Sequence, residues 1–277
     1  MDFLNRAAQA KRALKGAESI LIGAGAGLSD AAGMAYGGKR FTDNFAPFIN
    51  RFGITDMYSA GFYPFPSQEE KWAYWARHIL INRYDTPHPA LYLSLLQLIQ
   101  DKYYFVITTN VDGQFVEAGF PSERVFAAQG DYRFLQCAQG CHDVLYDNES
   151  LVKEMVRETS NCRIPSSLVP KCPVCGGSME VNLRCDEAFI QNGDWHEACN
   201  RYYEFTASVH NSKLVLLELG VGYNTPGIIR YPFERMAFLN ENAALIRLNR
   251  DYPDGARENA NRTVSFTEDM REVLKAL

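Results

Sequence analysis

Two pairs of cysteines have the spacing that binding of one metal ion requires. Three residues separate Cys137 from Cys141, and two separate Cys172 from Cys175. Short spacing lets both thiolates of a pair reach one ion from a tight turn, and two pairs complete a tetrahedral site. Since the protein then supplies all four ligands, we expect one structural zinc ion with no open position. His142 is an alternative ligand, and four buried thiols without a metal are the other interpretation.

A second group of residues has the chemistry of a nucleotide site. Glycine and alanine alternate over residues 23–27, directly after a short apolar run, and Ser29 is a good first-turn residue of a helix. Glycines let a backbone approach phosphates, and the N–H groups of a helix start bind them. Asn110 and Asp112 follow another apolar run, where ligands bind in open α/β sheets. A plain strand-to-helix turn is the alternative interpretation of the glycines.

A mostly parallel sheet with helices on both faces would position these residues. Short apolar runs predict strands at 19–22, 103–108, 213–219 and 244–248. Helical spacing predicts helices at 4–15, 28–34, 88–100 and 268–276. Strands that alternate with helices indicate an α/β, Rossmann-like fold.

Two segments differ in character from that sheet. Residues 36–84 are dense in aromatics without a strong strand, so we expect a helical insertion whose aromatics form local core rather than a ligand cage. Residues 136–189 contain the cysteine pairs and are expected to form a small zinc-ribbon domain. The Rossmann-like, dinucleotide-binding domain then consists of residues 1–35, 85–135 and 190–277.

The composition narrows the class of protein. The chain has 277 residues, of which 47% are hydrophobic and 22% charged, and its net charge is −5. This acidic balance, without a basic run, disfavours a nucleic-acid surface. We expect no membrane partner, because no apolar run approaches the ~20 residues that span a bilayer. Seven cysteines and a charged N-terminal stretch favour a reducing cytoplasm.

The order of the motifs along the chain resembles that of the sirtuins. The matching segments are 25–29 with Gly33, 88–91 with His88 and Pro89, 109–112, 220–222, 248–250 and the closing helix. Cys137 also follows Gln129 by the family's usual spacing from catalytic histidine to first zinc cysteine. The resemblance covers nearly the whole chain and implies a sirtuin fold with NAD as the co-substrate and one structural zinc ion.

The resemblance also implies roles for single residues. The phosphates are expected at Gly25, Ala26, Gly27, Ser29 and Gly33. The nicotinamide ribose is expected at Thr109, Asn110, Asp112 and Gln129, of which the last three are the expected catalytic residues. The adenosine is expected at Gly220, Val221, Gly222, Asn249 and Arg250.

Three departures from the family pattern bear on the reaction. Gln129 stands in place of the catalytic histidine, Arg40 is expected to bind NAD in place of a missing motif arginine, and residues 183–189 replace the acyl-lysine-binding stretch. These features resemble the class M sirtuins, a microbial branch associated with protein ADP-ribosylation. The resemblance implies that the acceptor is a lipoylated glycine-cleavage-H-like carrier protein and that a macrodomain ADP-ribosyl hydrolase reverses the modification.

Sirtuin chemistry has two steps, loss of nicotinamide and acyl transfer, and Gln129 decides which of them this protein can carry out. Loss of nicotinamide needs stabilisation of positive charge on the ribose, which amide oxygens and a carboxylate provide. Acyl transfer needs a general base worth ~10²–10⁴-fold, and an amide cannot act as one. We therefore expect mono-ADP-ribosyl transfer. A deacylase or NAD hydrolase and a non-catalytic NAD-sensing module are the alternatives. His78, His196 and His210 lie in no site motif and are expected at surface or capping positions.

Overall fold

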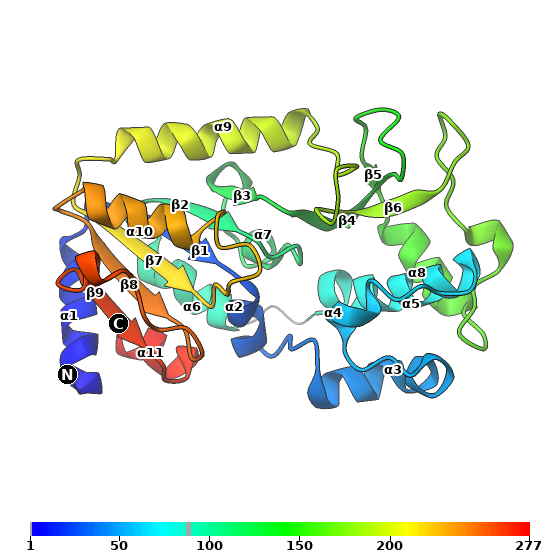
Figure 1. The fold of residues 1–277 in the computed structure, drawn as a ribbon, viewed down its shortest axis with the longest axis horizontal. Helices are drawn as coiled ribbons and strands as arrows, with labels where there is room; N and C mark the ends of the chain where they lie inside the picture. Colours follow the sequence, from blue (N-terminus) through cyan, green and yellow to red (C-terminus); the bar gives the residue numbers. More distant parts are fainter. Residues whose placement is uncertain (1, 87–89) are drawn as a thin grey trace. The chain divides into compact units, whose positions relative to one another are not determined.

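The computed structural model describes residues 2–86 and 90–277, which form two compact units (Figure 1). Unit 1 consists of Met1–Ala32, His88–Gln129 and Gly193–Leu277, and unit 2 consists of Gly33–Pro87 and Gly130–Asn192. The expected helical insertion and the cysteine pairs thus belong to the same unit. His88 and Pro89, part of one expected motif, lie outside the described residues.

Unit 1 is built on a six-stranded sheet whose described strands all pair in parallel. The strands are β1 Ser19–Ala24, β2 Tyr103–Thr108, β3 Val125–Ala127, β7 Leu214–Leu219, β8 Ala244–Leu248 and β9 Thr263–Phe266. Their order is β3-β2-β1-β7-β8-β9, so the direction of strand succession reverses between β1 and β7. Ligands of such sheets bind outside the carboxyl ends of the strands at this switch point.

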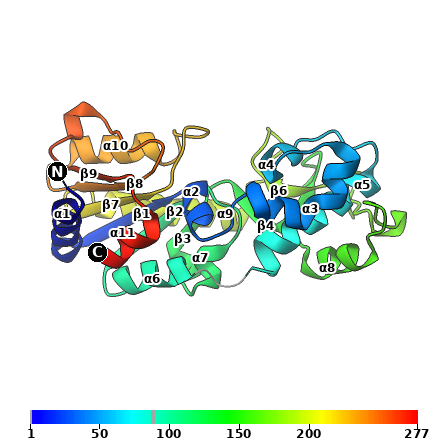
Figure 2. The same cartoon turned by 90° about the horizontal axis from the view of Figure 1, so that it is seen from below.

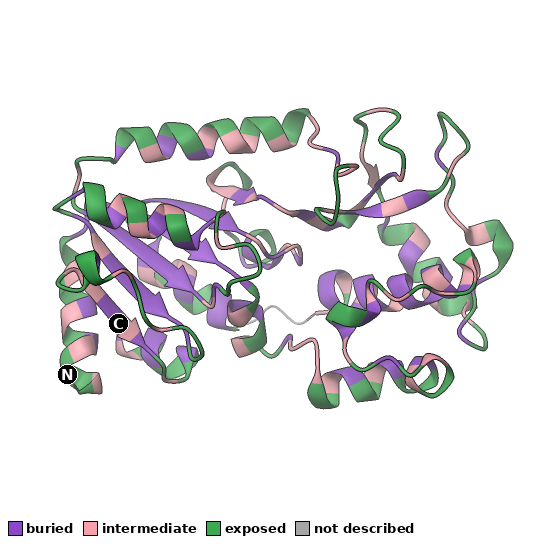
Figure 3. Ribbon diagram, viewed as in Figure 1, coloured by how far each residue is buried: buried purple, intermediate pink, exposed green. Residues whose placement is uncertain are grey.

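Helices cover both faces of the unit 1 sheet. Figure 2 shows α10 on one face and α6 and α11 on the other. Every residue of the central strands β1 and β7 is buried (Figure 3), which explains why their sequences are mainly apolar. The helical segments of this unit are α1 Phe3–Gly16, α2 Ala26–Ala31, α6 Ala90–Ile99, α7 Gln114–Glu117, η2 Ser122–Arg124, α9 Gly193–Ser208, α10 Arg230–Leu239, η4 Arg257–Asn259 and α11 Met270–Ala276.

Unit 2 combines helices with a small antiparallel sheet. Its helical segments are α3 Gly38–Phe52, α4 Met57–Ala60, α5 Gln68–Ile79, the π-helical η1 Leu80–Tyr84, α8 Glu149–Glu158 and η3 Ser166–Leu168. The strands β4 Gly130–Cys137, β5 Tyr146–Asp147 and β6 Met179–Leu183 pair in the order β5-β4-β6. Helix α5 of the first segment packs against α8 of the second, so the two segments share one core.

Aromatic side chains fill the helical part of unit 2. Trp72, Tyr74 and Trp75 are buried, and the Tyr74 ring packs against Phe65 with centroids 5.3 Å apart. The expectation of a local aromatic core holds for these residues. It is wrong for Phe62, which is 60% exposed. Within the described residues, no helix is both long and apolar enough to cross a membrane.

Candidate active site and metal centre

The loops after β1 and β7 approach each other so closely that both require glycine. A Cβ atom at Gly27 would lie 2.7 Å from the Gly220 Cα, and one at Gly25 would lie 2.8 Å from the Gly220 oxygen. Gly220 also has a φ of 62°, in the left-handed region that glycine favours. The Gly27 N–H donates to the Gly220 oxygen at 3.0 Å. The glycines therefore join the two loops at the switch point of the sheet, and the Gly27 N–H is already engaged.

Buried polar side chains from three segments meet beside this contact. The Ser29 hydroxyl of α2 donates to Oδ2 of Asp112 at 2.5 Å and lies 3.1 Å from the Tyr92 hydroxyl of α6. Asn110 Nδ2 donates to Ser29 Oγ at 3.1 Å and to the Gly25 oxygen at 3.0 Å. Both N–H bonds of the Asn110 amide are thus occupied, whereas its Oδ1 accepts no hydrogen bond within the described residues. This arrangement fixes the orientation of the amide and presents its oxygen as an acceptor.

A second acceptor lies next to Asp112. The Gln114 N–H donates to Asp112 Oδ1 at 3.1 Å, and Gln114 Nε2 donates to the Asp112 carbonyl at 3.2 Å. Gln114 Oε1 is buried without a partner in the described part of the chain. A buried acceptor without a donor is costly unless a ligand satisfies it. The carboxamide of nicotinamide carries such N–H donors. Sequence reasoning missed Gln114, which lies two residues after the expected motif.

Gln129 lies in the turn after β3, the last residue of its unit 1 segment. The turn is anchored by Ala128, whose oxygen accepts from Trp195 Nε1 of α9 at 3.3 Å. The Gln129 side chain is half-buried and makes no hydrogen bond to the described residues. Thr109, at the end of β2, donates its N–H to the Ala24 oxygen at 3.0 Å. Thr109 therefore holds the loop after β2 against β1.

The loops after β7 and β8 contain the residues expected at the adenosine. Asn249 Nδ2 donates to the Val221 oxygen at 2.8 Å, and Asn249 Oδ1 accepts from the Tyr252 N–H at 2.9 Å. The Asn249 amide thus ties the two loops together. Gly222 has open space where a side chain would begin, and Arg250 is exposed and pairs with the adjacent aspartate.

Four buried or half-buried charges lie under these two loops. Arg247 of β8 makes a two-pronged ion pair with Glu218 of β7, at 2.7 and 2.9 Å, and also binds Glu234 at 2.7 Å. Arg230 of α10 lies 3.3 Å from Glu218. Sequence reasoning missed this cluster. The sequence does contain a signal for it, because each of two otherwise apolar strands has one charged residue, acidic in β7 and basic in β8.

Two expected NAD residues belong to unit 2. Gly33 has a φ of 90°. Arg40 donates to Asn82 Oδ1 and to the Ile81 oxygen, both at 2.8 Å. The guanidinium thus holds η1 to α3.

The histidines differ from expectation in one case. His78 is buried, with Nε2 2.8 Å from the Tyr132 hydroxyl and Nδ1 3.1 Å from the Tyr74 hydroxyl. Burial lowers the pKa of His78 to about 3, so it stays neutral. The expected surface or capping position is therefore wrong for His78. It is confirmed for His196, which is exposed, and for His210, whose Nδ1 lies 2.8 Å from the Ala207 oxygen at the end of α9.

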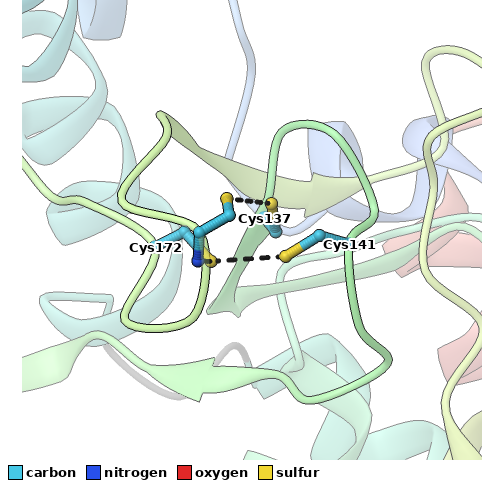
Figure 4. Close-up of side chains that lie close together, drawn as sticks. Cys137, Cys141 and Cys172 are labelled. Carbon is cyan, nitrogen blue, oxygen red and sulfur yellow. Dashed lines mark hydrogen bonds between the residues drawn. The ribbon is translucent and has the colours of Figure 1, made fainter.

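The four expected metal ligands converge in unit 2. The sulfur atoms of Cys137 and Cys175 lie 3.7 Å apart. Those of Cys141 and Cys172 lie 3.6 Å apart (Figure 4), and all four sulfurs lie within 4.8 Å of one another. Zinc bound tetrahedrally at ~2.3 Å from each sulfur places the sulfurs ~3.8 Å apart. The cluster therefore fits a structural zinc ion.

Backbone groups prepare one thiol of each pair for metal binding. The N–H groups of Cys141 and Gln139 lower the pKa of Cys137 to about 6, and the N–H of Cys175 lowers the pKa of Cys172. Zinc binds thiolates, so these contacts favour the ligand form. His142 Nδ1 lies 3.0 Å from the Cys141 sulfur, and its Nε2 lies 2.8 Å from the Tyr146 hydroxyl. His142 is thus placed to hydrogen-bond a ligand from outside the cysteine cluster.

The fold is that of the Sir2 enzymes. A structure reported as the structural basis of sirtuin substrate affinity has a TM-score of 0.60 at 18% identity, and 99% of each chain is covered. A Sir2 homologue in complex with NAD has a TM-score of 0.60 at 15% identity, over 97% of this chain and 92% of the other. At these identities the likeness establishes the fold, and the expected Rossmann-like sirtuin architecture is confirmed.

Closer relatives establish the family. A protein ADP-ribosyltransferase of Staphylococcus aureus (strain Mu50 / ATCC 700699) is 37% identical over 99% of this chain and 88% of the relative. A probable bifunctional ADP-ribose hydrolase/ADP-ribosyltransferase of Fusarium oxysporum f. sp. cubense is 34% identical over 84% of this chain, which spans 40% of that relative's length. No protein-family model matches the chain. The chain belongs to the family of the staphylococcal ADP-ribosyltransferase, which confirms the expectation of an NAD-dependent enzyme of sirtuin type.

Proposed function

We propose that this protein transfers single ADP-ribose units from NAD to a protein acceptor and releases nicotinamide. The observation that carries the proposal is Gln129, an amide in the turn after β3 where a sirtuin deacylase needs a basic histidine. We propose Asn110, Asp112 and Gln129 as the catalytic residues. The other expected NAD residues keep their assigned roles as part of the same proposal.

The first step breaks the bond between the ribose and nicotinamide. The bonding electron pair leaves with the nicotinamide nitrogen, and positive charge develops on the ribose. The oriented Oδ1 of Asn110 and the carboxylate of Asp112 are suited to stabilise that charge without moving a proton. Asp112 and Gln114 Oε1 would also accept from the nicotinamide carboxamide.

The second step forms a bond between the ribose carbon and a nucleophile of the acceptor, which releases its proton to solvent. In a deacylase, a histidine instead activates a ribose hydroxyl for attack on the acyl group. Gln129 can hydrogen-bond ribose hydroxyls but cannot accept their protons. Loss of a general base costs ~10²–10⁴-fold, so capture by the protein nucleophile prevails.

We further infer a class M sirtuin whose acceptor is a lipoylated glycine-cleavage-H-like carrier protein. Gln129, together with the loop at 183–189, supports this assignment. The fungal relative named for both ADP-ribose hydrolysis and ADP-ribosyl transfer supports a macrodomain hydrolase as the reversing partner.

Adenine-labelled NAD tests the proposal with three acceptors: a lipoylated carrier, its unlipoylated form and an acetyl-lysine peptide. Nicotinamide release and protein-bound label are followed together. We expect label on the lipoylated carrier alone. Label on both carriers would support the transferase activity and show that the acceptor need not be lipoylated. A deacetylated peptide would contradict the argument from Gln129. NAD loss without label would favour a hydrolase, and NAD stabilisation without turnover would favour a sensor.

A further inference from the structure

Arg230 occupies a position that disfavours a positive charge. It is the first residue of α10, where the helix dipole repels cations, and it is 2% exposed. Close packing fixes this end of the helix, because Gly23 of β1 leaves room for Ile229 and Phe233. A Cβ atom at Gly23 would lie 2.7 Å from the Phe233 ring. A buried cation here requires strong compensation from its contacts.

The contacts of Arg230 are mainly loop carbonyls. One guanidinium nitrogen donates to the oxygens of Tyr252 at 3.0 Å and Asp254 at 2.6 Å, and the other lies 3.4 Å from the Val221 oxygen. Val221 belongs to the loop after β7, and the other two belong to the loop after β8. One side chain therefore holds both loops.

The ion pair with Glu218 does not explain the need for Arg230. Arg247 already binds both oxygens of Glu218, at 2.7 and 2.9 Å, and the contact from Arg230 is longer at 3.3 Å. Arg247 also donates to the Asp254 oxygen at 2.8 Å. The distinctive contribution of Arg230 is thus its hold on the loops.

Arg230 also supports an exposed aromatic pair. Its guanidinium carbon lies 4.6 Å from the centroid of the Tyr223 ring, and Tyr252 meets Tyr223 edge to face at 5.0 Å. Both rings are about half exposed. They present apolar ring surface on the two loops that contain Gly222 and Asn249.

We propose that Arg230 is a positioning residue that fixes the loops after β7 and β8, and the Tyr223 ring, for the adenosine half of NAD. The inference rests on the proposed NAD site, but it concerns binding rather than transfer. A planar five-donor guanidinium suits this role, because it serves several carbonyls and a ring face at once.

Calorimetric titration with ADP-ribose, which lacks nicotinamide, tests the inference. In Arg230→Met we expect binding to weaken about tenfold or more, since charge-assisted hydrogen bonds to both loops are lost. The KM for NAD should rise, with kcat of nicotinamide release falling far less. Arg235→Met is the matched control, because Arg235 is exposed on the same helix. If Arg230→Met does not fold, Arg230→Lys keeps the charge beside Glu218 but loses the fork, and the same weakening is expected.

A second pair of variants tests the ring. Tyr223→Leu should weaken ADP-ribose binding several-fold, whereas Tyr231→Leu, exposed on α10, should leave it unchanged. Unchanged ADP-ribose affinity in folded Arg230 variants would overturn the inference. A fall in kcat as large as the loss of ADP-ribose affinity would also overturn it, because such a fall indicates general damage to the protein. A different result would overturn the proposed function alone: the wild type binds ADP-ribose more tightly than the Arg230 variants, but it transfers no label to any acceptor.

Discussion

The Ser29 hydroxyl links Asp112 and Asn110, because it donates to the carboxylate at 2.5 Å and accepts from the amide at 3.1 Å. Ser29 belongs to α2, which follows β1, whereas Asn110 and Asp112 belong to the loop after the neighbouring strand β2. Because both N–H bonds of the Asn110 amide are occupied, this side chain offers its oxygen to a ligand. Ser29 therefore acts on both proposed catalytic side chains at once.

Removal of the Asn110 amide should stop nicotinamide release. We expect Asn110→Ala to lower kcat by ~10²–10³-fold, because a preorganised group that stabilises developing charge is lost. Release of nicotinamide at saturating NAD measures this. Tyr203→Ala, at an exposed position of α9, serves as control and should behave as wild type. Near-normal turnover of Asn110→Ala would remove this residue from the site.

Restoring a base at position 129 tests the role of the glutamine. If Gln129 alone prevents deacylation, Gln129→His should raise deacylation of an acetyl-lysine peptide by ~10²-fold or more. The reaction is followed by mass spectrometry of the peptide. If the variant stays inactive while it still releases nicotinamide, the loop at 183–189 also prevents acyl-lysine binding.

Loss of one zinc ligand should destabilise unit 2. We expect Cys172→Ser to release zinc and to lower the melting temperature, because metal binding contributes folding free energy. Zinc released to a chromophoric chelator, together with a thermal melt, measures both effects. Cys199→Ser, on α9 and outside the cluster, should retain one zinc per chain. A Cys172→Ser protein with full zinc content would show that His142 or another group replaces the ligand.

Burial of His78 predicts an acid-sensitive unit 2. Its folded pKa of about 3 lies below the unfolded value of ~6.5, so only the unfolded chain binds the proton between these values. The stabilisation is complete above pH 6.5 and is lost as the pH falls, by up to ~1.4 kcal/mol per pH unit. We therefore expect wild type to lose ~2 kcal/mol more than His78→Gln between pH 7.5 and 5.

Urea unfolding at several pH values measures this difference, with fluorescence from Trp72 and Trp75 of the same unit. His210→Gln is the control, since it retains His78 and should retain the wild-type slope. Parallel pH profiles of wild type and His78→Gln would show that His78 does not titrate on unfolding.

Strands buried on both faces can be predicted from this sequence. The runs at 103–108 and 244–248 coincide with β2 and β8, because a central parallel strand is apolar over most of its length. The edge strands β3 and β9 were not predictable in this way. They have three and four residues, too few for an apolar run or a period to stand out.

The site was predictable only in part. Asn110 and Asp112 stand out because polar residues follow directly after a buried strand. The hold of Arg230 on the loops is different, since its partners are backbone oxygens of residues such as Tyr252 and Asp254. Any residue type supplies a carbonyl, so no side-chain pattern marks these contacts. Only the path of the folded chain shows them.

The division of the chain has a consequence for the order of synthesis. Unit 2 is complete in sequence at Asn192, with all its strands and all four cysteines. β1 belongs to the opening segment, yet one of its two neighbours, β7, begins only at Leu214. As the chain leaves the ribosome, unit 2 can therefore close around its metal while β1 still has one unpaired side. We expect zinc supply during translation to matter more for yield than zinc added to the finished chain.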